Sequence, residues 1–168
     1  MRKKITNNQG FTLLEIAVAV FIVSFGIVGV LALIHYNMQA EQVSKRQLVA
    51  SQLAQEGLEL VRNRRDNNWL NDLAWGEGIT NLSDNNFIVD YEGSFDESVD
   101  SLNEDGAKLY LNPQGFYDHQ GSTSTPYSRI INIKDIESDN FTLESTVQWS
   151  DQKGTHKYKA ETELYDWR

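Results

Sequence analysis

The chain has 168 residues, which suits one domain with an additional segment better than two domains. It carries 24 acidic side chains against 15 Lys and Arg, and this formal net charge of −9 argues against non-specific nucleic-acid binding, which needs excess cations. The sequence has no cysteine, which excludes disulfides, thiolate metal sites, iron–sulfur clusters and cysteine nucleophiles.

The first ten residues form a short basic leader. They contain Arg2, Lys3 and Lys4 and no acidic residue, and they end at Gly10. Without them the chain would have 12 basic and 24 acidic side chains, a formal net charge of −12. Such an acidic body favours solubility outside a membrane and repulsion between copies.

Residues 11–34 form a continuous apolar run. As a helix with a rise of ~1.5 Å per residue, the run would extend about 36 Å and cross a bilayer core. The cations precede the run, and none follows before Lys45. The bias of positive charge toward the inside therefore predicts residues 1–10 in the cytoplasm and the chain beyond Ile34 outside it.

Two simpler explanations of this run are a secretory signal and a plain membrane anchor. A secretory signal has a shorter apolar stretch and a small-x-small cleavage site, and no clear site follows Ile34. An anchor explains the length and charge but not Glu15 or the placement of Gly10 directly before Phe11. A carboxylate at the centre of a membrane helix costs about 2.5–3.5 kcal/mol. Alternatively, Glu15 lies at the headgroups and residues 16–34 span the bilayer alone.

The segment Gly10-Phe11-Thr12-Leu13-Leu14-Glu15, after a basic leader and before a long apolar helix, resembles the class-III signal of type IV prepilins. The resemblance covers about the first 35 residues. It implies cleavage between Gly10 and Phe11 by a membrane aspartic prepilin peptidase, and N-methylation of the new Phe11 amine. It also implies that Glu15 pairs with the N-terminal ammonium of a neighbouring subunit and so fixes axial register.

Residues 35–66 continue as an amphipathic helix, so that one helix is predicted from about residue 12 to 65. The small residues Ala50, Ala54 and Gly57 share one face and would allow close approach by a sheet. Gly26 and Gly29 lie in the apolar half. They indicate either ordinary tolerance of glycine in membrane helices or local loosening when a subunit leaves the bilayer.

The predicted helix ends in a cluster of cations, Arg62, Arg64 and Arg65. Cations suit a helix C-terminus, and the following Asp66-Asn67-Asn68 predicts a stop. Because the body is acidic, this placement favours solvated capping over binding to DNA.

Residues 67–168 are predicted to form an antiparallel β head of about four or five strands, packed on the outer half of the helix as an α+β, pilin-like fold. Strand patterns of period two occur at residues 87–91, 107–111, 127–133, 141–149 and 155–165. Turn residues at 150–154 predict a hairpin between the last two. With no disulfide, the loop near residues 112–126 must be held by packing and hydrogen bonds or stay mobile.

The C-terminal half also resembles PilV-type minor pilins and related pseudopilins. The shared features are Tyr127-Ser-Arg-Ile, the strand containing Val147 and Trp149, a glycine turn, and a last strand that ends in Leu164-Tyr-Asp-Trp. This resemblance implies a structural subunit in a minor role.

No catalytic, cofactor or metal motif is evident. The acidic stretch 96–105 does not have the spacing of a calcium loop, and a solvated loop is favoured. We therefore expect a non-enzymatic filament subunit whose partners are the peptidase, other pilin subunits, an inner-membrane assembly machinery and lipid. The alternatives are a type II secretion pseudopilin and an anchored binding domain that does not polymerise.

Overall fold

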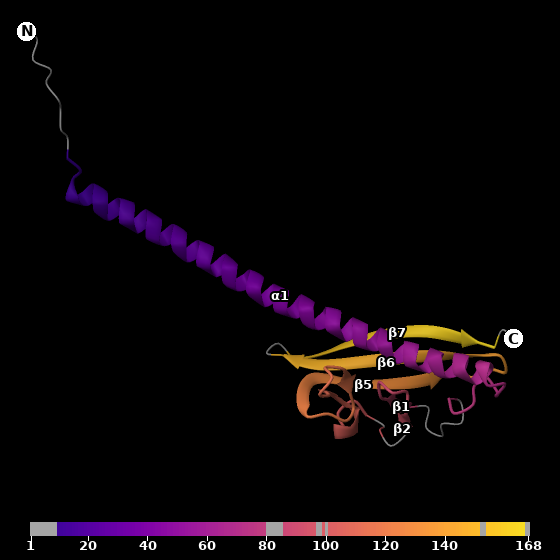
Figure 1. Cartoon of the computed structure of the whole chain (residues 1–168). Coiled ribbons are helices and arrows are strands. Elements are labelled where there is room, and N and C mark those ends of the chain that lie inside the picture. Colours follow the sequence, from indigo (N-terminus) through magenta and orange to yellow (C-terminus); the bar gives the residue numbers. More distant parts are fainter. Residues whose placement is uncertain (1–9, 80–85, 97–98, 100, 152–153, 167–168) are drawn as a thin grey trace, which may run out of the picture. The chain divides into compact units, whose positions relative to one another are not determined.

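The computed structural model describes residues 10–79, 86–96, 99, 101–151 and 154–166. The chain consists of two compact units, Met1–Lys45 and Arg46–Arg168. A single helix, α1 (Leu13–Leu70), contributes its first part to the first unit and its last part to the second. Seven strands complete the second unit, so the predicted α+β, pilin-like architecture is confirmed (Figure 1).

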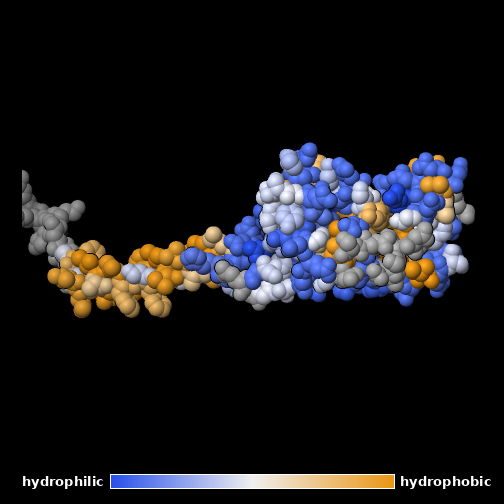
Figure 2. All heavy atoms as spheres, turned by 90° about the horizontal axis from the view of Figure 1, so that it is seen from below, coloured by the Kyte–Doolittle hydropathy of each residue, from blue (hydrophilic) through white to orange (hydrophobic). Residues whose placement is uncertain are grey.

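The N-terminal part of α1 is apolar and exposed. The helix is long and apolar enough to cross a membrane, and none of its most apolar stretch is buried by the rest of the protein. Figure 2 shows this apolar surface on the helix and a mostly hydrophilic surface over the head. The helix continues without interruption through Gly26 and Gly29.

The predicted stop at Asp66-Asn67-Asn68 is wrong, because α1 continues to Leu70. Asn68 and Trp69 continue the buried face of the helix, and the Asn68 amide donates to the carbonyls of Trp75 and Glu77. The helix ends in a Schellman motif. The Leu73 N–H donates to the Asn68 carbonyl at 2.9 Å, the Asp72 N–H donates to the Trp69 carbonyl at 3.3 Å, and Asp72 has a φ of 56°.

The sheet has more strands than expected among the described residues, because two of them are only two residues long. The strands are β1 (Asn86–Val89), β2 (Phe95–Asp96), β3 (Lys108–Leu111), β4 (Tyr117–Asp118), β5 (Thr123–Lys134), β6 (Asn140–Asp151) and β7 (Gly154–Tyr165). A short 3-10 helix, η1 (Asp105–Ala107), precedes β3. Every pairing is antiparallel.

The three twelve-residue strands β5, β6 and β7 lie side by side and form the body of the sheet (Figure 1). The predicted C-terminal hairpin is confirmed, because β6 and β7 pair from Asn140 opposite Tyr165 to Asp151 opposite Gly154. Gly154 has a φ of 132°, a conformation that glycine adopts without strain. On its other edge β5 pairs with β1 and β3.

Strand β5 starts four residues earlier than predicted, and Pro126 lies inside it. Pro126 has no N–H to donate, and the β3–β5 register shifts between Lys108 and Tyr110. The Thr125 hydroxyl donates to the Leu109 carbonyl at 2.6 Å there. In the same region, β3 pairs with β4 and the Asn112 side chain accepts from the Phe116 N–H at 2.9 Å. Of the two alternatives that the sequence left open for the 112–126 loop, the structure shows the first, in which packing and hydrogen bonds hold the loop.

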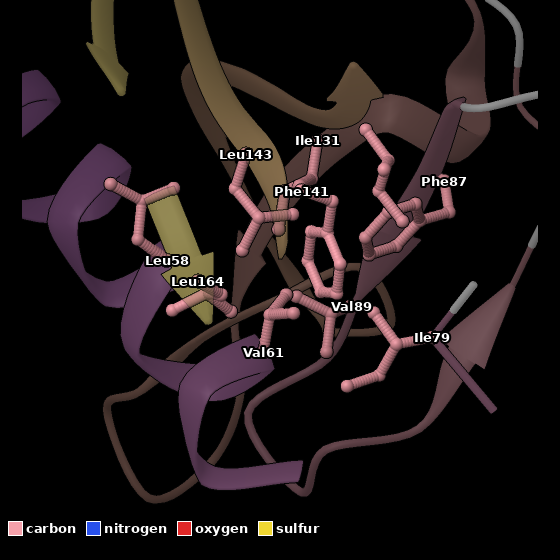
Figure 3. Packing of buried hydrophobic residues seen from close by; sticks show 10 residues of the cluster. Leu58, Val61, Ile79, Phe87, Val89, Ile131, Phe141, Leu143 and Leu164 are labelled. Carbon is pink, nitrogen blue, oxygen red and sulfur yellow. The ribbon is translucent and has the colours of Figure 1, made fainter. Parts of the chain in front are cut away.

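The core lies between the last turns of α1 and one face of the sheet. In Figure 3, Leu58 and Val61 of α1 meet Leu164 of β7, Leu143 and Phe141 of β6, Ile131 of β5, and Phe87 and Val89 of β1. A second cluster joins Ala50, Leu53 and Ala54 to residues that include Tyr127, Val147 and Trp149. The predicted helix face therefore packs on the sheet.

Candidate functional site

The helix start is built around Thr12. Gly10, Phe11 and Thr12 precede the first helical residue, Leu13. The Thr12 hydroxyl accepts from the Glu15 N–H at 3.2 Å, and the Thr12 carbonyl accepts from the Ile16 N–H at 3.2 Å. Thr12 is therefore the N-cap of α1, and Glu15 occupies the N3 position of a Thr-x-x-Glu sequence.

Sequence analysis missed this cap, although the spacing of Thr12 and Glu15 could have revealed it. In a capping box, a Ser or Thr at the N-cap precedes a Glu or Gln by three residues. A carboxylate in the first turn also interacts favourably with the partial positive charge of the helix N-terminus. Glu15 can therefore stabilise the start of its own helix without contact to a second molecule.

The predicted cleavage bond lies outside the helix. Gly10 and Phe11 have no helical backbone bonds, the Phe11 side chain is 78% exposed, and a Cβ added to Gly10 would meet no atom within 4 Å. The cap at Thr12 fixes where the helix begins and leaves the Gly10–Phe11 peptide bond on its non-helical side. The leader cations Arg2, Lys3 and Lys4 lie outside the described residues.

Glu15 is the single ionisable side chain of the 11–34 run. Within the described part of the chain, no cation forms an ion pair with its carboxylate. The surrounding surface is apolar, since Leu13, Leu14 and Ile16 are all more than half exposed. A carboxylate in such a setting needs a partner charge when water is removed.

The exposed apolar surface continues from Leu13 to Met38 and would be shielded from water in a membrane or an assembly. Large apolar side chains from Leu13 to Met38 are about half or more exposed, far more than a soluble monomer leaves in contact with water. The hydroxyl of Ser24 donates to the Val20 carbonyl at 2.7 Å and so carries no unsatisfied donor into an apolar layer. Lipid or neighbouring apolar helices suit this surface.

In the head, Arg129 of β5 forms hydrogen bonds with both the helix and the sheet. Its side chain is fully buried, and its guanidinium donates to the Leu53 carbonyl of α1 at 3.1 Å and to the Val89 carbonyl of β1 at 2.8 Å. It also pairs with Glu56 at 3.3 Å. Burial lowers the pKa of Arg129, and Glu56 opposes that shift. The motif containing this arginine was noticed only as a resemblance, because exposed and buried arginines look alike in a sequence.

Gly57 allows α1 to approach the sheet closely, as predicted for the small residues of this face. A Cβ at position 57 would lie 2.9 Å from the Ser145 hydroxyl and 3.2 Å from both Arg129 Cδ and Ile131 Cδ1. The helix–sheet distance is therefore set for a residue without a side chain. This contact is structural, and it positions the head on α1.

The described residues hold no group of three or more His, Asp or Glu that could bind a metal ion. Of the acidic stretch 96–105, Glu97, Ser98 and Asp100 lie outside the described residues, so its interpretation as a solvated loop stays a prediction. The Arg62–Arg65 cluster is not at the helix end. Arg62 pairs with Glu59, Arg65 pairs with Asp66, and the guanidinium of Arg65 lies 4.5 Å from the centre of the Trp69 ring.

Comparison with known proteins bears on the N-terminal segment. Residues 5–31 match the family model described as the prokaryotic N-terminal methylation motif. No curated protein and no solved structure matches the chain. The motif belongs to type IV pilin-like structural proteins rather than enzymes. Together with the apolar helix and its Thr12 cap, it supports a type IV pilin-like or pseudopilin-like substrate of prepilin peptidase with a membrane anchor.

Proposed function

We propose that the chain is a structural subunit, in a minor role, of a type IV pilus or a related extracellular filament. The observation that carries the proposal is the methylation motif at the start of a capped helix whose apolar N-terminal part is exposed. Residues 1–10 are the leader, 11–34 the membrane and filament-core half of the helix, 35–66 the amphipathic half, and 67–168 the head. Before assembly the leader lies in the cytoplasm and the head outside.

In this proposal a prepilin peptidase cleaves between Gly10 and Phe11, and the Phe11 amine is then methylated. The non-helical backbone at both residues supports the role, because proteases bind their substrates in extended form. Cleavage places a positive charge four residues before Glu15, in a layer of low dielectric. A subunit whose Glu15 meets the Phe11 ammonium of its neighbour buries two neutralised charges, and any other axial register strands both.

The experiment is mass spectrometry of the N-terminus in cells that assemble the filament. We expect the mature chain to begin at methylated Phe11 and the sheared surface fraction to contain it. An intact leader would reject processing and leave a plain anchor. Methylated Phe11 without any surface filament would instead favour a pseudopilin that works in type II secretion. The mature N-terminus and the content of the surface fraction together separate the pilus subunit, the pseudopilin and the plain anchor.

A further inference from the structure

Strand β7 is a free edge of the sheet. Among the described residues it pairs only with β6, along all of its length from Gly154 to Tyr165. At every second residue of β7, the backbone N–H and C=O groups point to the outer edge, where no described strand pairs with them. An edge of this length is a ready template for another strand unless its side chains forbid pairing.

The exposed side chains of β7 have an ordered charge pattern. Leu164 and Ala160 point toward the core clusters, while the odd-numbered positions between Thr155 and Tyr165 are exposed. Along this exposed face, two lysines, Lys157 and Lys159, are followed by Glu161 and Glu163. The sign of the charge thus inverts about Ala160.

This inversion makes the strand complementary to itself. When two β7 strands run antiparallel with their Ala160 residues opposite each other, Lys157 faces Glu163 and Lys159 faces Glu161. The two-fold axis repeats both pairs. The same alignment places Thr155 opposite Tyr165, so that nearly the whole strand is paired. A shift by two residues, the smallest that keeps the faces aligned, would place Lys159 opposite Lys159 or Glu161 opposite Glu161.

Lys134 is a cation near Glu161 in the single chain, since its hydrogen bond to Glu144 and, to a smaller extent, the charge of Glu161 raise the pKa of Lys134. Glu161 lies directly opposite Glu144 across the β6–β7 ladder, and like charges in that position repel. Lys134 and Lys159 both donate to Glu144, at 2.6 and 2.8 Å. No ion pair to Glu161 is present among the described residues. A lysine on the open side of β7 would give Glu161 a direct ion pair.

We propose that β7 pairs with β7 of a second copy of this chain, in an antiparallel, two-fold symmetric dimer that joins two sheets into one. The axis runs perpendicular to the sheet, so the Arg46–Leu70 part of α1 in one copy runs opposite to that in the other. The pair therefore connects heads that point in opposite directions.

The competing interpretation is that the four charges merely block the edge. Charge reversal separates the two in the full chain, solubilised in a non-ionic detergent and measured by sedimentation equilibrium. Lys157→Glu/Lys159→Glu makes the exposed face all acidic, and Glu161→Lys/Glu163→Lys makes it all basic. We expect each variant alone to dimerise about a hundredfold more weakly than wild type, because cross-strand attractions become repulsions.

Mixing the two variants should restore dimers, and the variant with all four charges reversed should dimerise like wild type. Because all three carry the same membrane helix, association through α1 would not distinguish them. Wild type that stays monomeric at every soluble concentration would overturn the proposal, and so would dimers that are indifferent to the reversals. Tryptophan fluorescence identical to wild type would show that the heads remain folded.

The register can be tested separately, because the natural chain has no cysteine. Lys159→Cys and Glu161→Cys variants, mixed under mild oxidation, should form a mixed disulfide in preference to either homodimer. Lys157→Cys mixed with Glu161→Cys is the matched control and should form less. Equal yields from the two mixtures would overturn the register and the charge argument with it.

Discussion

Gly57 offers a sharp test of how tightly the helix packs on the sheet. Alanine in a helix interior is favoured over glycine by about 1 kcal/mol, so Gly57→Ala would stabilise an unhindered helix. Here the new methyl group would lie 2.9 Å from the Ser145 hydroxyl and 3.2 Å from side-chain carbons of Arg129 and Ile131. Overpacking of this kind costs about 1–3 kcal/mol.

The overpacking cost should exceed the gain in helix propensity, because two of the three neighbouring side chains cannot move aside. Arg129 is fixed by its bonds to two backbone carbonyls, and Ile131 is fully buried in the core. We expect Gly57→Ala to lower the free energy of unfolding by about 1 kcal/mol. Ser145→Ala removes the nearest atom, and that hydroxyl has no hydrogen-bond partner in the described part of the chain. With Ser145→Ala in place, only the two contacts at 3.2 Å remain, so Gly57→Ala should cost less than it does in the wild-type background.

The assay is urea unfolding of the full chain in a mild detergent, followed by tryptophan fluorescence. All four tryptophans lie after residue 68, so the signal reports on the head. Gly26→Ala is the control, since a Cβ there meets no atom within 4 Å, and it should leave the transition unchanged. A Gly57→Ala protein more stable than wild type, or additive effects of Gly57→Ala and Ser145→Ala, would refute the close contact.

Three further outcomes are expected. Gly10→Val should leave the leader attached, since a branched side chain would crowd an extended substrate, and a normally shortened mutant on mass spectrometry would contradict this. A fragment of residues 36–168 should be soluble and show mixed helix and sheet by circular dichroism, because it retains both core clusters, whereas a disordered spectrum would show that the head needs its neighbours. Burial, and then the charge of Arg129, lowers the pKa of His119 to about 4. Below about pH 6.5 the imidazole of His119 is protonated in the unfolded chain but stays neutral in the folded head. As the pH falls from 6.5 to 4, the folded state should therefore lose up to about 3 kcal/mol of stability relative to the unfolded state. His119→Gln should flatten this part of the stability profile, and an unchanged profile would exclude His119 as its cause.

Much of the fold could be predicted because its determinants are local. The period of the apolar residues located the buried face of α1, and alternation located the long strands to within a few residues. The β6–β7 hairpin followed from turn residues between two alternating runs. Each of these signals lies within a short window of sequence.

The errors arose where distant contacts override local preference. Asp66-Asn67-Asn68 has the composition of a helix stop, but Asn68 turns inward and bonds two carbonyls of the following loop. Pro126 cannot donate a ladder bond, yet it lies inside β5, where the neighbouring Thr125 hydroxyl donates to the Leu109 carbonyl. The burial of Arg129 could not be read from its motif, because it depends on carbonyls that lie 76 and 40 residues away along the chain.

At the candidate site, the sequence analysis left the role of Thr12 unassigned. The motif identified Gly10, Phe11 and Glu15 through resemblance, and each remains a prediction. Thr12 escaped attention because its hydroxyl acts on the backbone and not on a partner. Its bond to the Glu15 N–H shows that the sequence around the cleavage bond also specifies where the helix starts.

Glu15 therefore has two physical roles that a single substitution can separate. At N3 of a capping box, glutamine can replace glutamate, because either side chain can accept a hydrogen bond from the N-cap N–H, and only the smaller attraction between the charge and the helix dipole is lost. Pairing with a neighbouring ammonium does need charge, and a stranded ammonium in an apolar core costs several kcal/mol. Glu15→Gln should thus keep the helix start and processing but lose assembly, as Glu15→Val should. The measurement compares mature protein, membrane pool and sheared filament fraction for wild type and both variants. If Glu15→Gln enters filaments at wild-type levels while Glu15→Val does not, capping suffices and the register role fails. If both enter at wild-type levels, neither role limits assembly, and the carboxylate simply lies at the headgroups.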